Sequence, residues 1–174
     1  GDVVFSVKPL APMQKAEDIS FELHSGEILG IVGSIGAGKT EVARAIFGAD
    51  RRQSGVITMK GEDLKIRGPR DAIGAGIALV PEERRKQGLV TTESIRKNMT
   101  LVSLGKKFCA GGFWIKKQKE REAVQKSIKD FKMATPSTEQ ETRLLSGGTQ
   151  QKVVIGKWLL SDSSIYILSM VIFK

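Results

Sequence analysis

Hydrophobic and polar positions alternate in the first part of the chain, as they do in half-buried strands. Residues 3–7 and 19–23 both show this alternation, and Pro9 and Pro12 are expected to end the first strand. Residues 55–64 predict a further strand followed by a turn. The first two segments therefore predict a small antiparallel layer.

Two short apolar runs show no helical spacing. Residues 28–32 and 77–80 are continuous enough to predict strands that are covered on both faces, as in a parallel sheet. Between them, apolar residues recur at helical spacing over 42–47, and Gly48 is expected to end that helix. A strand, a turn and a helix followed by another buried strand predict an α/β fold.

The pattern changes to helices from Thr91 onward. Ile95, Met99 and Val102 share one face of a predicted helix. A charged helix is expected over 116–132, with its charges on a solvated face, and a further helix is expected over 150–160. The helices predict a helical insertion in the α/β fold.

Composition limits the class of protein. A chain of 174 residues with 40% apolar residues suits one globular domain. No apolar run approaches the roughly 20 residues of a membrane-spanning helix. Nothing resembles a signal peptide, and the single Cys109 cannot form an internal disulfide, so a cytosolic location is expected. His24, the only histidine, is expected at the surface.

The net charge of +9 calls for a partner or ligand of opposite sign. Nucleotide, nucleic acid and an anionic membrane surface all qualify. The basic residues are dispersed and few aromatics are interleaved with them, so a nucleic-acid partner is not expected. A solvated basic surface accounts for most of the charge.

A glycine-rich turn joins the first buried strand to the helix that follows it. Its pattern is G-x-x-x-x-G-K-[ST], in which backbone amides and a helix N-terminus surround a phosphate chain. Lys39 is expected to reach the β- and γ-phosphates of ATP, and the Thr40 hydroxyl to bind Mg2+. The predicted ATP-binding residues are Gly33, Ser34, Ile35, Gly36, Ala37, Gly38, Lys39, Thr40 and Glu41.

Glu82 follows the second buried strand. The carboxyl ends of parallel strands are where α/β sheets place ligand-facing groups, so Glu82 is a candidate site residue. An ordinary exposed carboxylate fits the spacing equally well.

A second turn carries a serine and two glycines at the start of the last predicted helix. Amides, a hydroxyl and a positive dipole end are again presented to an anion. Taken alone, such a turn is more often a helix cap. The residues are Leu145, Ser146, Gly147, Gly148, Thr149 and Gln150.

With both turns in place, the chain resembles the ATP-binding cassette (ABC) family. The closer likeness is to the second cassette of the tandem ATP-binding subunits of bacterial monosaccharide importers of the ribose, galactose and xylose type. The matching segments are GEILGIVG at 26–33, GAGKTE at 36–41, DAIGAGIALVPEERRKQGL at 71–89, SIRKNMTL at 94–101 and LSGGTQQKVVIGKWL at 145–159.

The resemblance implies one cassette domain over 1–174. It has a P-loop core at 1–87 and 164–174, and a helical subdomain at 88–163. Residues 33–40 resemble the family's Walker A loop and residues 145–151 resemble its signature, the turn called here the signature turn. In the family, the Walker A loop of one cassette and the signature of another close on the same ATP. The implied partners are therefore a second cassette, membrane permease subunits and, indirectly, a periplasmic sugar-binding protein. The implied location is the cytoplasmic face of the bacterial inner membrane.

The resemblance also gives family positions to Glu82 and to the last residues of the chain. Glu82 stands at the position of the family's Q-loop glutamine, from which it could contact Mg2+ together with Thr40. Residues 165–168 resemble the Walker B strand, but Ser169 and Met170 replace its two carboxylates and no switch histidine follows. We therefore expect a cassette truncated at Walker B, with the C-terminal part of the core missing, that binds ATP without useful hydrolysis.

Two alternatives remain open at this stage. One is a non-hydrolytic cassette that completes the ATP site of a partner. The other is a soluble ABC ATPase that acts on ribosomes or DNA rather than on transport.

Overall fold

A computed structural model of the chain describes residues 1–12, 19–34, 36–111 and 114–169. The chain divides into two compact units. The first is Gly1–Leu79 with Ser164–Ser169, and the second is Val80–Ser163. Residues 80–87, which the sequence analysis assigned to the core, fall in the second unit.

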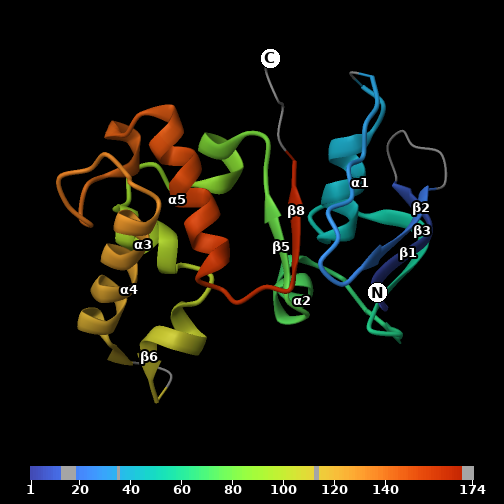
Figure 1. The fold of residues 1–174 in the computed structure, drawn as a ribbon, viewed down its shortest axis with the longest axis horizontal. Helices are drawn as coiled ribbons and strands as arrows, with labels where there is room; N and C mark the ends of the chain where they lie inside the picture. Colours follow the sequence, from blue (N-terminus) through green and yellow to red (C-terminus); the bar gives the residue numbers. More distant parts are fainter. Residues whose placement is uncertain (13–18, 35, 112–113, 170–174) are drawn as a thin grey trace. The chain divides into compact units, whose positions relative to one another are not determined.

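The first unit contains an antiparallel sheet in the order β2-β1-β3-β4 (Figure 1). Its strands are β1 (Val3–Pro12), β2 (Ile19–His24), β3 (Arg52–Met59) and β4 (Glu62–Asp63). Phe5 and Val7 pair with Met59 and Ile57, and their side chains are buried. The alternating apolar residues thus form the core face, which confirms the strands predicted in this region.

β1 does not end at Pro9, as the sequence analysis expected. Its pairing with β3 shifts register between Lys8 and Ala11, and this irregularity accommodates a residue without an N–H group. Gly55 lies opposite with φ 117°, where a Cβ atom would stand 2.7 Å from the Leu10 Cα. A glycine on the neighbouring strand is therefore what lets β1 continue past the proline.

Helix α1 (Lys39–Ile46) follows the glycine-rich turn and confirms the predicted helix. It buries Val42, Ala43, Ala45 and Ile46, and Gly48 follows it in the left-handed region with φ 73°. The short helix α2 (Pro69–Gly74) precedes β5 (Ile77–Val80). Among the described residues, β5 and β8 (Ile165–Leu168) pair as neighbours that run in the same direction (Figure 1).

The strand predicted at 28–32 is wrong. Residues 27–34 belong to none of the described strands, and Ile28 and Val32 are 97% and 93% exposed. A strand exists only through ladder hydrogen bonds to a neighbour, and an apolar run cannot supply that neighbour. The apolar pattern indicated a tendency to be covered, but the described residues provide no pairing strand.

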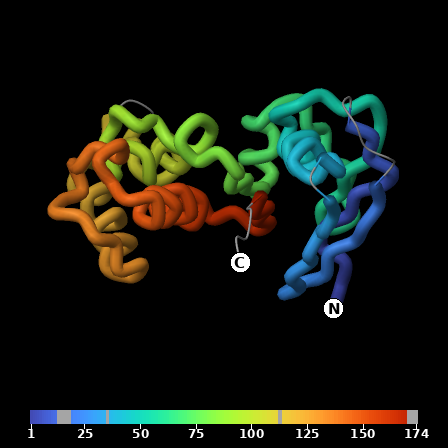
Figure 2. Tube along the Cα trace, turned by 90° about the horizontal axis from the view of Figure 1, so that it is seen from above, coloured from blue at the N-terminus to red at the C-terminus, as the bar shows by residue number. Residues whose placement is uncertain are grey.

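The second unit is mainly helical (Figures 1 and 2). It contains the π-helical turns η1 (Arg84–Gly88) and η2 (Leu104–Phe108), the hairpin β6 (Cys109–Ala110) and β7 (Trp114–Ile115), and the 3-10 turn η3 (Thr142–Leu144). Helix α3 (Ile95–Thr100) packs against both α4 (Lys117–Asp130) and α5 (Gly147–Leu159). Ile95, Met99, Val124, Val153 and Val154 are fully buried and form its core.

One charged residue of α4 departs from a solvated polar face. Glu120 is only 2% exposed, and its carboxylate accepts hydrogen bonds from Arg96 Nη1 at 2.6 Å and Thr100 Oγ1 at 2.5 Å. Arg96 also donates to both carboxylate oxygens of Glu139, which lowers the pKa of Glu139. This network ties α3 to α4 and to the loop that precedes the signature turn.

Two further surface features bear on the sequence predictions. The His24 side chain is 42% exposed and its Nδ1 is hydrogen-bonded to the Glu27 carboxylate at 3.0 Å, which confirms its place at the surface. None of the helices in the described ranges is long and apolar enough to cross a membrane.

Candidate functional site

The glycine-rich turn of the first unit is held by backbone geometry rather than by packing. Gly36 and Gly38 have φ values of 82° and 85°, a left-handed conformation that residues with a Cβ atom adopt only under strain. Ala37 N donates to Ser34 O at 3.2 Å, and Val42 N donates to Gly38 O at 3.0 Å as α1 begins. The loop therefore has the shape that presents amides to an anion.

Lys39 folds back over this loop. Its Nζ donates to the Gly33 carbonyl at 2.6 Å and to the Ser34 carbonyl at 2.9 Å. A Cβ atom at Gly33 would lie 3.1 Å from the Ala37 Cβ and 3.7 Å from the Lys39 Nζ, so a side chain there would occupy the mouth of the loop. Glycine keeps that space open for a ligand.

The other predicted residues of this site are placed as follows. Thr40 and Glu41 lie in the first turn of α1, beside the loop. Ile35 lies outside the described residues. Glu82 is exposed at the end of β5 and precedes the turn η1. The predicted metal ligands Thr40 and Glu82 belong to different units.

The signature turn of the second unit is a capped helix N-terminus. Ser146 is the N-cap of α5, and its Oγ accepts from the Thr149 amide at 3.3 Å and bonds the Thr149 hydroxyl at 3.0 Å. The helix starts at Gly147 and not at Gln150, because glycine is tolerated at the first positions once a serine caps them. Leu145, Thr149 and Gln150 are buried, whereas Ser146 and Gly148 are exposed.

Two arginines beside this turn were not foreseen as site residues. Arg85 Nε donates to Gln150 Oε1 at 3.1 Å, and Gln150 Nε2 donates to the Thr142 carbonyl at 2.9 Å. Arg84 Nη2 lies 2.6 Å from where a Gly147 Cβ would stand, so a side chain at Gly147 would displace the guanidinium. No local sequence pattern links Arg84 and Arg85 to the turn, because Arg85 and Gln150 are 65 positions apart in the chain.

The C-terminal end of α5 is also attached to segment 84–88. Lys157 is buried, and its Nζ donates to the Gly88 carbonyl at 2.6 Å and lies 5.4 Å from the ring centroid of Trp158. Burial lowers the pKa of Lys157 to about 8. Segment 84–88 therefore contacts α5 at Gly147, Gln150 and Lys157.

The comparison with family models identifies the class of protein. A model described as ABC transporter matches residues 16–169. The chain therefore belongs to the ABC transporter family, as the sequence resemblance predicted. The α/β P-loop cassette fold is that of the family.

Similar proteins narrow the type of ABC protein that the chain resembles. The chain is similar to a putative ribose/galactose/methyl galactoside import ATP-binding protein 1 of Rhizobium etli, with 46% identity over 168 residues that cover 97% of this chain and 32% of the relative. Ribose import ATP-binding protein RbsA of Chelativorans sp. is 48% identical over 168 residues, which cover 97% and 33% of the two chains. The chain thus spans about a third of the length of these relatives.

Solved structures agree on the fold. The cbiO1 protein of Clostridium perfringens, part of the ABC transporter complex cbiONQ, has a TM-score of 0.71 at 18% identity and covers 97% of this chain and 65% of its own. An ATP-binding cassette in a dimeric post-hydrolysis state with ADP and Pi has a TM-score of 0.75 at 17% identity, with 94% and 72% covered. Identities this low support the fold alone.

Proposed function

We propose that this chain is the ATP-binding cassette of a subunit that couples ATP binding and hydrolysis to the import of a simple sugar. The observation that carries the proposal is the identity of 46–48% to sugar import ATP-binding proteins along 97% of the chain, a span that contains both phosphate-facing turns. The partners are a second cassette, permease subunits and, indirectly, a periplasmic sugar-binding protein. The cassette acts at the cytoplasmic face of the inner membrane.

The Walker A residues fit a triphosphate. The ammonium of Lys39 already lies over the loop, and its two bonds to neutral carbonyls can be exchanged for stronger charge-assisted bonds to the β- and γ-phosphates. The amides of the left-handed turn and the N-terminus of α1 add positive potential. Mg2+ would be held by the Thr40 hydroxyl, and would neutralise phosphate charge.

The signature turn acts on the nucleotide of the partner. Ser146 and the amides of Gly147 and Gly148 begin α5 and present its positive end to solvent. An anion that approaches this turn from another cassette meets donors that are already oriented. The two turns of one chain therefore serve two different ATP molecules.

The first experiment measures ATP affinity by titration of a fluorescent ATP analogue. Lys39→Ala removes the charge aimed at the phosphates, a contact of about 1.5–3 kcal/mol, so Kd is expected to rise about 10- to 150-fold. Lys65→Ala is the matched control, because Lys65 is an exposed lysine of the same unit outside the loop. Equal affinity of Lys39→Ala and the parent chain would remove the assigned ATP site.

A second candidate function is a non-hydrolytic cassette that completes a partner's site. The observation in its favour is Ser169, which follows β8 where the family resemblance places the Mg2+-orienting carboxylate. Loss of a positioned general base typically lowers the rate about 10²- to 10⁴-fold. We expect phosphate release by the parent chain to stay at background, and to rise when Ser169→Asp and Met170→Glu are combined. Turnover by the parent that Lys39→Ala abolishes would exclude the non-hydrolytic role.

A further inference from the structure

The segment 104–119 of the second unit concentrates positive charge. Its sequence, LGKKFCAGGFWIKKQK, contains five lysines and no acidic residue. Lys107 is paired with Asp162 at 2.5 Å, and Glu120, the next acid along the chain, is buried against Arg96 and Thr100. The four other lysines are exposed, and no ion pair involves them in the part of the chain that the structure describes. These are Lys106, Lys116, Lys117 and Lys119.

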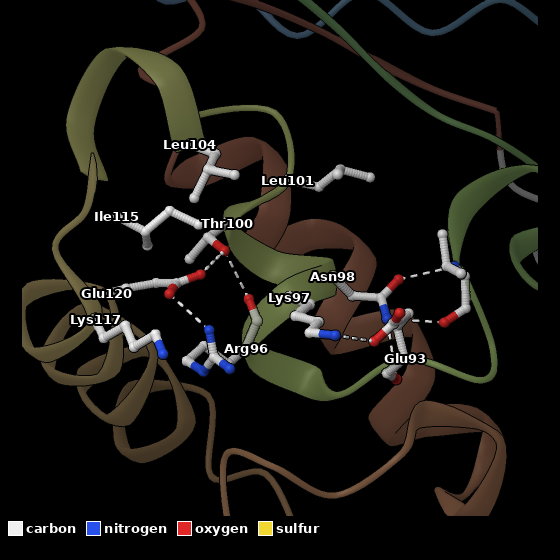
Figure 3. A pocket seen from close by; sticks show the side chains of 11 residues that line it. Glu93, Arg96, Lys97, Asn98, Thr100, Leu101, Leu104, Ile115, Lys117 and Glu120 are labelled. Atoms are coloured by element: carbon white, nitrogen blue, oxygen red, sulfur yellow. Dashed lines mark hydrogen bonds and ion pairs between the residues drawn. The ribbon is translucent and has the colours of Figure 1, made fainter. Parts of the chain in front are cut away.

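A hairpin in the middle of this segment exposes a tryptophan. In β6 and β7, Cys109 pairs with Ile115 and Ala110 with Trp114. Successive strand residues point to opposite faces, and Ile115 lines a hollow of about 500 Å3 with Leu101 and Leu104 (Figure 3). Trp114 points the other way and is 80% exposed. The hairpin precedes the N-terminal end of α4 (Figure 1), so the exposed indole and the lysines without ion pairs belong to neighbouring stretches of the chain.

Helix stability does not account for these lysines. Lys116 is the N-cap of α4 without a side-chain cap bond, and Lys117 and Lys119 lie in its first turn. Cations stabilise the C-terminal end of a helix and weaken its N-terminal end. Core packing does not account for Trp114, because its ring stays in solvent. The exposed lysines and Trp114 would make favourable contacts with a partner that is anionic and partly apolar.

An anionic lipid surface has this combination of properties. Tryptophan prefers the headgroup level of a bilayer, where its ring is half buried and its N–H group stays hydrated. Lysine stems lie along apolar surface while their ammonium groups reach lipid phosphates. A single-stranded nucleic acid is a poorer match, because it needs successive aromatic platforms and Trp114 is one ring.

We propose that the hairpin residues of β6 and β7, together with Lys106, Lys116, Lys117 and Lys119, bind the surface of an anionic bilayer directly. Trp114 enters the headgroup layer, and the lysines contact lipid phosphates. The proposal goes beyond the proposed function, in which the permease alone holds the cassette at the membrane. It adds a lipid contact that would orient the helical unit on the membrane.

The first test is sedimentation of the full chain with vesicles at low salt. Vesicles of equal parts phosphatidylglycerol and phosphatidylcholine are compared with phosphatidylcholine alone. Lys116→Gln combined with Lys119→Gln is expected to lower partitioning to the anionic vesicles about 25-fold, at about fivefold per lysine. Lys126→Gln combined with Lys129→Gln is the matched control, because these two exposed lysines lie further along α4. Less than a twofold loss is expected for this control.

The second test uses the two tryptophans. Lipids brominated near the headgroup are expected to quench Trp114 in the parent chain, whereas Trp158, only 5% exposed, should stay unquenched in Trp114→Phe. An unchanged Trp158 emission maximum verifies that each variant is folded. Equal binding to both vesicle types, equal loss in both double variants, or quenching that persists in Trp114→Phe would overturn the proposal. ATP affinity is measured separately, so these outcomes leave the proposed function untouched.

Discussion

The two turns that we propose to face phosphate are built in opposite ways. Most of the described residues of the Walker A loop are exposed, and Lys39 Nζ donates to the Gly33 and Ser34 carbonyls of the same loop. The signature turn is held by side-chain hydrogen bonds: Ser146 caps it, Arg85 donates to Gln150, and Gln150 donates to the Thr142 carbonyl. Gln150 is completely buried.

The difference indicates when each turn acquires its final geometry. A loop held by few contacts can relax when no ligand is present, so part of its order comes from bound nucleotide. A turn held by buried hydrogen bonds keeps its shape without a ligand, as the role proposed for it toward another cassette's phosphate would require. Substitutions in the first turn should therefore change affinity, and those in the second should change stability.

The largest expected effect on stability is at Gln150. Gln150→Ala removes the hydrogen bonds to Arg85 Nε and to the Thr142 carbonyl and empties a fully buried position, so the unfolding free energy should fall by about 2–4 kcal/mol. Urea unfolding followed by Trp158 emission in a Trp114→Phe background reports the helical unit. Gln118→Ala is the matched control, because Gln118 bonds Glu122 on the exposed face of α4 and should cost less than about 0.5 kcal/mol.

The same measurement separates the two turns. Lys39→Ala should change the unfolding free energy by less than about 0.5 kcal/mol although it weakens ATP binding. A Gln150→Ala chain as stable as the parent would mean that the signature turn is no better held than the Walker A loop, and the comparison would fail.

The second prediction concerns Lys157, which attaches the far end of α5 to Gly88. The unfolded chain keeps this lysine protonated up to its ordinary pKa, whereas burial lowers the folded pKa to about 8. Between these values the unfolded state binds more protons, so stability should rise with pH above about 8. The total gain is on the order of 2–3 kcal/mol.

Lys157→Met tests this assignment, since it keeps the apolar stem and removes the titrating group. The difference in unfolding free energy between parent and variant should change across this pH range, and Lys152→Met should show no such change. A constant difference between parent and Lys157→Met from pH 7 to 10 would contradict the inferred cost of burying the charge.

Short-range patterns predicted most of the elements. Alternation placed β1 and β2, helical spacing placed α1 and α3, and a four-residue apolar run placed β5, because in each case the pattern matches the surface that becomes buried. The local backbone of the two turns was also predictable from the sequence, since glycine and serine at fixed spacing dictate it.

Long-range contacts could not be predicted from the sequence. Residues 28–32 carry the same apolar signal as β5, yet the described residues give them no strand to pair with. Charge on α4 suggested a solvated face, whereas Glu120 turns inward because Arg96 and Thr100 lie opposite it. The bond from Arg85 to Gln150 joins segments that no local pattern connects.

The last prediction concerns Gly36 in the Walker A loop. A Cβ atom there would meet no heavy atom within 4 Å, so Gly36→Ala adds only the strain of a φ near 82°. That strain is roughly 1–2 kcal/mol for a residue with a side chain. If the free loop can relax, the strain appears when ATP restores the left-handed turn, and Kd should rise about five- to thirtyfold with little change in stability.

Gly30→Ala is the matched control, because Gly30 lies in the same unit, has equal space around it and is outside the left-handed region. Its affinity should equal that of the parent. If Gly36→Ala instead lowered the unfolding free energy by about 1 kcal/mol or more and left Kd unchanged, the free loop would already hold its bound shape. The Walker A loop would then be as preorganised as the signature turn, because strain that exists in both states cancels from the binding equilibrium.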